Sequence, residues 1–193
     1  FDKAMELANK EGYVFVPPYQ DPYIIAGQGT IALELLEDVP DLDTIVVAIG
    51  GGGLASGIAL AAKALRPTIK IIGVQSDQVD TICRLFKGEA PAPKARIATI
   101  ADGIAVKNAT SVMVDGFIKK YIDEIVTVSD EEIAEAIVFL LEKQRTVGEG
   151  AGAAALAALM AKKAKIKGKT AVIIGGGNID LNIISRIVEK GLV

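Results

Sequence analysis

Four consecutive glycines, Gly50 to Gly53, stand between a run of β-branched residues and a segment rich in Ala and Leu. Without side chains, successive backbone amides can turn toward one anion, and the start of a following helix adds a partial positive charge. A tight turn needs only one or two glycines, and each further one costs about 0.5 to 1 kcal/mol in chain entropy. We therefore favour a phosphate-binding loop over a plain flexible turn.

Two further glycine clusters are Gly148-Glu149-Gly150-Ala151-Gly152 and Gly175-Gly176-Gly177-Asn178. The last cluster follows a β-branched run directly, as the tetraglycine run does. In an open parallel sheet both would lie at the carboxyl edge of the strands, where ligands bind. Glu149, between two glycines, is a candidate ligand-facing carboxylate, and a solvated loop carboxylate is the alternative.

Two common phosphate motifs do not fit the chain. The dinucleotide fingerprint needs glycines at relative positions one, three and six. A fingerprint starting at Gly50 or Gly51 would have Ala55 or Ser56 at the sixth position, and one starting at Gly52 would have Leu54 at the third. The P-loop needs a glycine five residues before Gly168, and that position is Lys163. Neither a dinucleotide nor a nucleoside triphosphate is therefore indicated by motif.

The composition excludes several classes of chemistry. The sequence has no histidine, which removes Ser-His-Asp catalysis and histidine-ligated zinc. Its one cysteine, Cys83, cannot form an intrachain disulfide. A net charge of −3 offers no broad basic field for nucleic acid, and no apolar stretch has the length and composition of a membrane span. With no secretory signal at the start, we expect a cytoplasmic protein.

The elements that must position these residues alternate along the chain. β-branched runs predict strands that are buried on both faces of a parallel sheet, and periodic segments between them predict helices. Ser129-Asp130-Glu131-Glu132 is a capping box that opens one of the helices. The fold expected is α/β, with three layers around a mostly parallel sheet. Strands are predicted at 14–16, 44–49, 69–74, 124–128 and 170–174, and helices at 1–10, 23–37, 54–65, 81–87, 110–121, 129–145, 151–163 and 179–190.

Four motifs together resemble those of the threonine ammonia-lyase (threonine dehydratase) family, which belongs with serine racemase among the fold-type II pyridoxal-phosphate enzymes. They are Gly50-Gly51-Gly52-Gly53-Leu54, Thr99-Ile100-Ala101-Asp102-Gly103, Glu149-Gly150-Ala151-Gly152 and Gly175-Gly176-Gly177-Asn178-Ile179-Asp180. The resemblance runs from Phe1 to Val193. It implies that residues 1–16 end a small domain and that residues 17–193 form the C-terminal part of a cofactor-binding large domain.

The resemblance also implies a cofactor, pyridoxal 5'-phosphate, and a role for each motif. Gly50, Gly51, Gly52 and Gly53, with the amide of Leu54, would hold the cofactor's phosphate. Gly103 would lie close to the pyridine ring, Glu149 would face the polar edge of the ring, and Gly175 would lie beside the pyridine nitrogen.

The sequence departs from the family pattern at several points. The Ser-Phe-Lys motif that carries the cofactor's lysine and the Ser-Gly-Asn-His loop that grips the substrate carboxylate are not in this sequence. We therefore expect no catalytic residue here, and a missing N-terminal segment of the same enzyme as a partner. Gly175 stands where the family has serine or cysteine. Gln75 stands where racemase-like members have an acidic metal ligand, so no metal site is expected.

The function implied is a pyridoxal-phosphate-dependent lyase that converts L-threonine or L-serine to a 2-oxo acid and ammonia, as in isoleucine biosynthesis. The expected partners are an amino-acid substrate and further copies of the chain in a homo-oligomer, with neither nucleic acid nor membrane. Two alternatives remain open. One is a non-catalytic anion- or cofactor-binding fragment, and the other is a serine racemase-like or β-replacement enzyme of the same fold.

Overall fold

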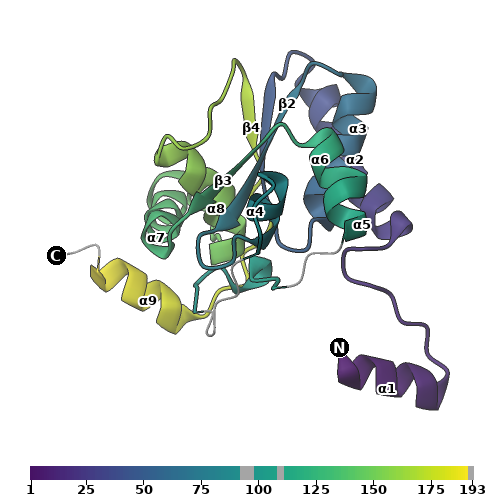
Figure 1. Ribbon diagram of the computed structural model, residues 1–193. Coiled ribbons are helices and arrows are strands. Elements are labelled where there is room, and N and C mark those ends of the chain that lie inside the picture. Colours follow the sequence, from purple (N-terminus) through teal and green to yellow (C-terminus); the bar gives the residue numbers. More distant parts are fainter. Residues whose placement is uncertain (92–97, 108–110, 191–193) are drawn as a thin grey trace.

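The β-branched runs pair as parallel strands in the computed structural model, which describes residues 1–91, 98–107 and 111–190 (Figure 1). Within those ranges the sheet has the order β3-β2-β1-β4, and every pairing is parallel. Because β1 and β4 are neighbours, the tetraglycine and Gly175 loops leave from the same edge of the sheet, as predicted. The strands are β1 (Thr44–Ala48), β2 (Lys70–Ser76), β3 (Glu124–Val128) and β4 (Thr170–Val172).

The predicted helices form with boundaries that differ from the prediction by at most three residues, apart from the segments described below. Two of them begin with the caps that the sequence supplies. Asp21 accepts hydrogen bonds from the amides of Tyr23 and Ile24, and the capping box of Ser129 and Glu132 is present. The helices are α1 (Asp2–Glu11), α2 (Pro22–Asp38), α3 (Gly53–Leu65), α4 (Thr81–Phe86), α5 (Ser111–Met113), α6 (Lys119–Tyr121), α7 (Asp130–Phe139), α8 (Gly150–Met160) and α9 (Leu181–Lys190).

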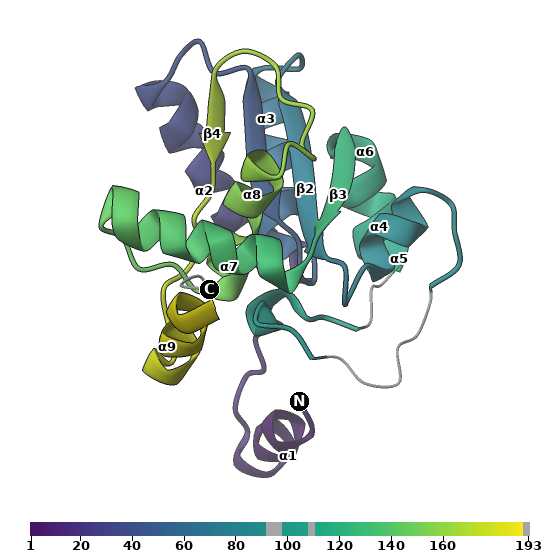
Figure 2. The ribbon, with the colours of Figure 1, turned by 90° about the vertical axis from the view of Figure 1, so that its left-hand side faces the viewer.

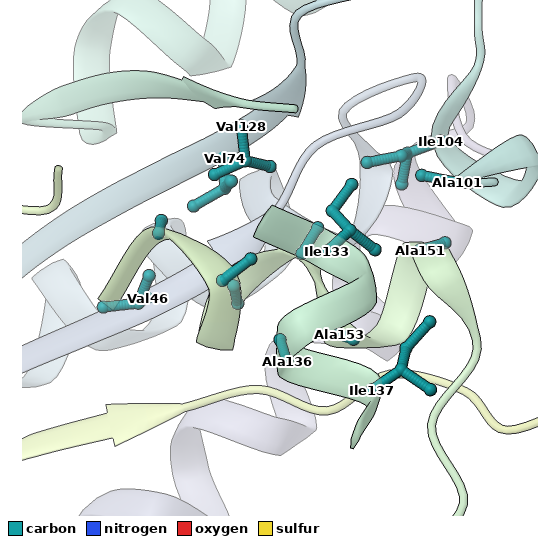
Figure 3. Close-up of a cluster of buried hydrophobic side chains, with 14 of the residues drawn as sticks. Val46, Val74, Ala101, Ile104, Val128, Ile133, Ala136, Ile137, Ala151 and Ala153 are labelled. Atoms are coloured by element: carbon teal, nitrogen blue, oxygen red, sulfur yellow. The ribbon is translucent and has the colours of Figure 1, made fainter. Parts of the chain in front are cut away.

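Helices cover both faces of the sheet and give three layers. In β1, Ile45 and Val47 face a core shared with α2 and α3, whereas Val46 faces a core shared with α7 and α8. This alternation follows from the two-residue period of a strand. Figure 3 shows the second core, in which Ile133 and Ile137 of α7 and alanines of α8 pack beside Val46. The three-layer α/β prediction is confirmed.

Small residues allow α2 and α3 to pack closely on one face. A Cβ on Gly57 would overlap the carbonyl oxygen of Ile25, and one on Gly29 would lie 3.2 Å from the Cβ of Ala61. Two helices whose backbones come this near can exclude water and gain dispersion contacts along their length. The start of α3, which follows the tetraglycine run, is thereby fixed against α2.

The predicted strand at 14–16 is wrong. Those residues are extended but pair with no strand of the described chain, and Val14 and Val16 are 87% and 62% exposed. β-branched residues form a strand only where a neighbour offers a ladder and a face to pack on. The preceding helix α1 also buries no residue and lies apart from the sheet in both ribbon views (Figures 1 and 2).

Other boundaries differ for local reasons. The helix predicted at 110–121 is described from Ser111, and it passes through a π-helical turn at Val114–Ile118. Thr110 and the middle of the predicted surface excursion at 88–99 lie outside the described residues. A second π-helical turn, Leu140–Gln144, ends the helix that follows the capping box. In the described part of the chain, no helix combines the length and apolar character needed to cross a membrane.

Candidate functional site

A cavity of about 460 Å³ opens at the carboxyl edge of the sheet, between the loops that follow β1 and β4. Ligand pockets for small molecules have volumes of roughly 300 to 1,000 Å³. The structure brings all eight predicted site residues to this one cavity, although they come from four separate motifs. They are Gly50, Gly51, Gly52, Gly53, Leu54, Gly103, Glu149 and Gly175.

The backbone amides from Gly50 to Ala55 are the most distinctive feature of the cavity. None of the six donates a hydrogen bond to another described residue, and the next amide in the chain, that of Ser56, bonds to the carbonyl of Gly52. Gly51, Gly52, Gly53 and Ala55 are buried. The amides from Gly52 to Ala55 open α3 and have no partner within the helix, so at this buried helix start they are available to an external acceptor such as an anion.

The start of α3 strengthens this array of donors. Gly52 is the N-cap residue with a φ of 97°, and no side chain caps the helix. The partial positive charge of the helix therefore remains available to an anion at this point. Among the described residues that line the cavity, Glu149 is the one that carries a charge, so an anion would be held by amides rather than by lysine or arginine.

Each glycine of the loop also has a packing reason that the sequence could not show. A Cβ on Gly50 would lie 3.1 Å from the Cα of Ile104. Gly52 has the positive φ, and a Cβ there would lie 3.2 Å from the Cε of Met113. Gly51 and Gly53 are both approached by Tyr19. The four glycines thus serve close packing and backbone conformation as well as the exposure of amides.

Glu149 joins the second and third glycine clusters. Its Oε2 accepts a hydrogen bond of 2.9 Å from the amide of Asn178, and its own amide donates to the carbonyl of Gly176 at 3.0 Å. A Cβ on Gly176 would lie 2.8 Å from its carboxyl carbon, so a side chain there would displace the Glu149 carboxylate from its present position. Within the described residues, Oε1 accepts no hydrogen bond and is available to a ligand in the cavity.

Gly103 lies opposite the tetraglycine loop, in a 3₁₀ turn formed by Asp102–Ile104. A Cβ on Gly103 would lie 3.0 Å from the Cβ of Ala151 and 3.6 Å from Oε1 of Glu149. The turn is tied to α7 by Asp130, whose carboxylate accepts from the Thr99 hydroxyl at 2.5 Å and from the Ile100 amide at 3.2 Å. These contacts fix the wall of the cavity that faces the amides.

Gly175 differs from the other glycines because it has space around it. A Cβ at this position would meet only the Cδ2 of Leu54, at 3.9 Å, and its φ lies outside the left-handed region. A larger residue would therefore fit without strain. The packing around position 175 therefore does not require glycine.

No lysine within the described ranges lines the cavity. Lys63 and Lys70 form ion pairs with Asp123 and Glu124, at 2.8 and 2.6 Å. Both pairs lie at the amino edge of the sheet, opposite the cavity, since they are at or before the starts of β2 and β3.

Gln75, at the position compared with an acidic metal ligand, is fully buried. Its Nε2 donates to the carbonyl of Ile49 at 3.3 Å, and its Oε1 accepts from the amide of Cys83 at 2.7 Å. The carboxamide therefore has a structural role between β1 and α4. Burial also raises the pKa of the Cys83 thiol above its ordinary value, so this cysteine is a poor nucleophile.

The sequence did not point to several residues of the cavity wall. Pro18 and Tyr19 come from the bend before α2, and Ile104 and Val106 belong to or follow the 3₁₀ turn. None belongs to a glycine cluster or shows a spacing of its own.

Comparisons with known proteins agree with this geometry. A family model described as "Pyridoxal-phosphate dependent enzyme" matches residues 1–177. The L-threonine ammonia-lyase of Thermotoga maritima is 49% identical over 195 residues, which cover 100% of this chain and 48% of that protein. The chain spans about half the length of the curated relatives it matches.

Solved structures give the same result. The processed form of threonine deaminase isoform 2 from Solanum lycopersicum has a TM-score of 0.87 at 32% identity, covering 100% of this chain and 54% of that one. A maize serine racemase has a TM-score of 0.85 at 33% identity, covering 97% and 59%. The resemblance to threonine ammonia-lyases that the four motifs indicated is confirmed.

Proposed function

Because the chain belongs to the pyridoxal-phosphate-dependent enzyme family, we propose that it forms the phosphate- and ring-binding part of a lyase. The lyase would convert L-threonine or L-serine to a 2-oxo acid and ammonia. The similar proteins of known name include an L-threonine ammonia-lyase and a threonine deaminase, which favours this reaction over others.

The observation that carries the proposal is the run of unpaired amides from Gly51 to Ala55, in which every residue except the half-buried Leu54 is buried. A phosphate ester presents several strong acceptor oxygens, and amides at a helix start can bond to them without a lysine or arginine. The same cavity of about 460 Å³ is also lined by Gly103, Glu149 and Gly175, which lie beyond the loop. The residues present therefore fit pyridoxal 5'-phosphate.

When bound, the cofactor supplies an electron sink that eases removal of a proton from the α-carbon of an amino acid. The residues of this chain would hold and orient it. The amides of Gly51 to Leu54 would hold the phosphate, and Oε1 of Glu149 would accept from a polar group on the ring. Ile104 and Ala151 would give one wall an apolar lining that excludes water.

The test is calorimetric titration of pyridoxal 5'-phosphate and inorganic phosphate into the wild-type protein and Gly52→Val. We expect the variant to lose binding, because a β-branched residue resists a φ of 97° and its Cβ would press on Met113. Gly27→Val, in the open on α2 with nothing within 4 Å of its Cβ, is the matched control and should bind normally. If Gly52→Val bound pyridoxal 5'-phosphate as tightly as the wild type, the tetraglycine loop would not be the phosphate-binding site.

One observation favours a second candidate, a cofactor-binding unit that does no chemistry by itself. Lys63 and Lys70 are ion-paired away from the cavity, and none of the described lysines lines it.

A racemase of the same fold is distinguished by its product. Formation of 2-oxobutanoate from L-threonine supports the lyase, whereas D-serine from L-serine without a 2-oxo acid supports the racemase.

A further inference from the structure

The tetraglycine loop is crossed by a segment that none of the glycine motifs includes. Pro18 and Tyr19 precede α2 and line the cavity together with Gly51 and Gly53. Tyr19 is half-buried, whereas Tyr23, four residues later, is 88% exposed. The two tyrosines therefore have different structural roles despite their closeness in sequence.

The ring of Tyr19 lies face-on against Gly51. A Cβ built on Gly51 would overlap three ring carbons, Cγ, Cδ1 and Cδ2, at nearly equal distances. Equal distances to neighbouring ring atoms place the glycine over the face of the ring rather than at its edge. The main chain of Tyr19 then passes Gly53, where a Cβ would lie 2.9 Å from its Cα, Cβ and carbonyl oxygen.

The other two glycines of the loop pack against different segments. A Cβ on Gly50 would lie 3.1 Å from the Cα of Ile104, and one on Gly52 would lie 3.2 Å from Met113. Alternate residues of the loop are thus in contact with Tyr19 and with the segments that carry Ile104 and Met113. A loop of four glycines has high conformational freedom by itself, so these contacts determine the conformation in which its amides remain unpaired.

We propose that Tyr19 is a positioning residue of the phosphate-binding loop. Its ring and main chain hold Gly51 and Gly53 so that the amides of the loop converge on one anion. This inference rests on the proposed function, because it assigns Tyr19 a role toward the same phosphate. The contact is made by the face of the ring, so the phenolic hydroxyl is not required.

The first test measures affinity for pyridoxal 5'-phosphate by calorimetry in four proteins: wild type, Tyr19→Ala, Tyr19→Phe and Tyr23→Ala. We expect Tyr19→Ala to bind about tenfold more weakly, which corresponds to the loss of about one amide hydrogen bond. Tyr19→Phe keeps the ring and should bind as the wild type does. Tyr23→Ala is the exposed control and should also be unchanged.

The second test is a double-mutant cycle in the protein without ligand. Gly51→Ala should lower the thermal unfolding midpoint, because the new methyl group overlaps the ring of Tyr19. In the Tyr19→Ala background the same change should lower the midpoint much less. Additive shifts would contradict the contact on which the inference depends.

The outcomes separate the two proposals. No binding of pyridoxal phosphate by the wild-type protein would contradict the proposed function, and with it this role of Tyr19. Wild-type binding that Tyr19→Ala leaves unchanged would contradict the inference alone. A lower unfolding midpoint with unaltered affinity in Tyr19→Ala would show a purely structural tyrosine, which also overturns it.

Discussion

At the scale of single residues, the glycines of the site have the same chemistry but different reasons to be glycine. Gly52 has a positive φ, Gly51 is closely approached by the ring of Tyr19, and Gly175 has neither feature. A sequence shows only that a side chain is absent and does not show what has approached. For this reason the motifs predicted the glycines and Glu149 of the cavity but not the contact of Tyr19 with the tetraglycine loop.

Gly175 is therefore the position at which a side chain can be added without disturbing the packing. We expect Gly175→Ser to tighten the binding of pyridoxal 5'-phosphate by up to about tenfold, because in the proposed binding mode its hydroxyl would pair with the pyridine nitrogen. Affinity would be measured by fluorescence or calorimetric titration.

Gly175→Ala is the matched control for this change, since it adds the same Cβ without the hydroxyl. It should bind as the wild type does, because only Leu54 approaches the position, at 3.9 Å. Weaker binding by Gly175→Ser than by Gly175→Ala would show that the ring nitrogen is not beside residue 175.

At the scale of elements, the sequence predicted those helices and strands that have a clear residue pattern of their own, such as a β-branched run or a capping box. Continuous β-branched runs gave β1, β2 and β3, and the capping box at Ser129 gave the start of α7. The failure at 14–16 has the opposite cause, because Val14 and Val16 have strand propensity but no neighbouring strand in the described chain. The π-helical turns also depend on surroundings, and no local pattern marks them.

The contact between α2 and α3 should be sensitive to one added methyl group. We expect Gly57→Ala to lower the free energy of unfolding in urea by about 1 to 3 kcal/mol, because the Cβ would overlap the backbone carbonyl of Ile25, which cannot rotate away. The start of α3 would move with it, so phosphate affinity should fall as well.

Gly27→Ala, on the same helix pair but with nothing within 4 Å of its Cβ, provides the comparison. Alanine is favoured over glycine inside a helix by about 1 kcal/mol, so this change should leave stability equal or raise it. If both variants unfolded at the same urea concentration, the close packing of α2 on α3 would not be important for stability.

At the scale of the whole molecule, the site exists because the parallel sheet brings distant segments to one edge. Gly50, Gly103, Glu149 and Gly175 span more than half of the chain and line one cavity. Parallel strands place the loops that follow them together, so the sequence predicted that Gly50 and Gly175 meet. The family resemblance added Gly103 and Glu149. The sequence could not predict the position of the segment before α2, because Pro18 and Tyr19 lie in a bend and carry no periodic signal.

The arrangement of lysines gives a prediction for the molecule as a whole. Lys63 and Lys70 are paired with carboxylates at the edge opposite the cavity, and the cavity itself has no lysine among its described lining residues. The cofactor should therefore be held by its phosphate and ring alone. We expect the 193-residue protein to bind pyridoxine 5'-phosphate, which has no aldehyde, about as tightly as pyridoxal 5'-phosphate.

Covalent trapping provides the decisive measurement for this expectation. A lysine that bonds to the aldehyde would be fixed by borohydride reduction and found by peptide mass spectrometry as one modified site. We expect only scattered, low-level modification of exposed lysines, unchanged when an excess of pyridoxine 5'-phosphate fills the cavity. Modification of one lysine that the competitor prevents would place a reactive amine at the site, and this chain would then carry out the first covalent step without help from any other segment.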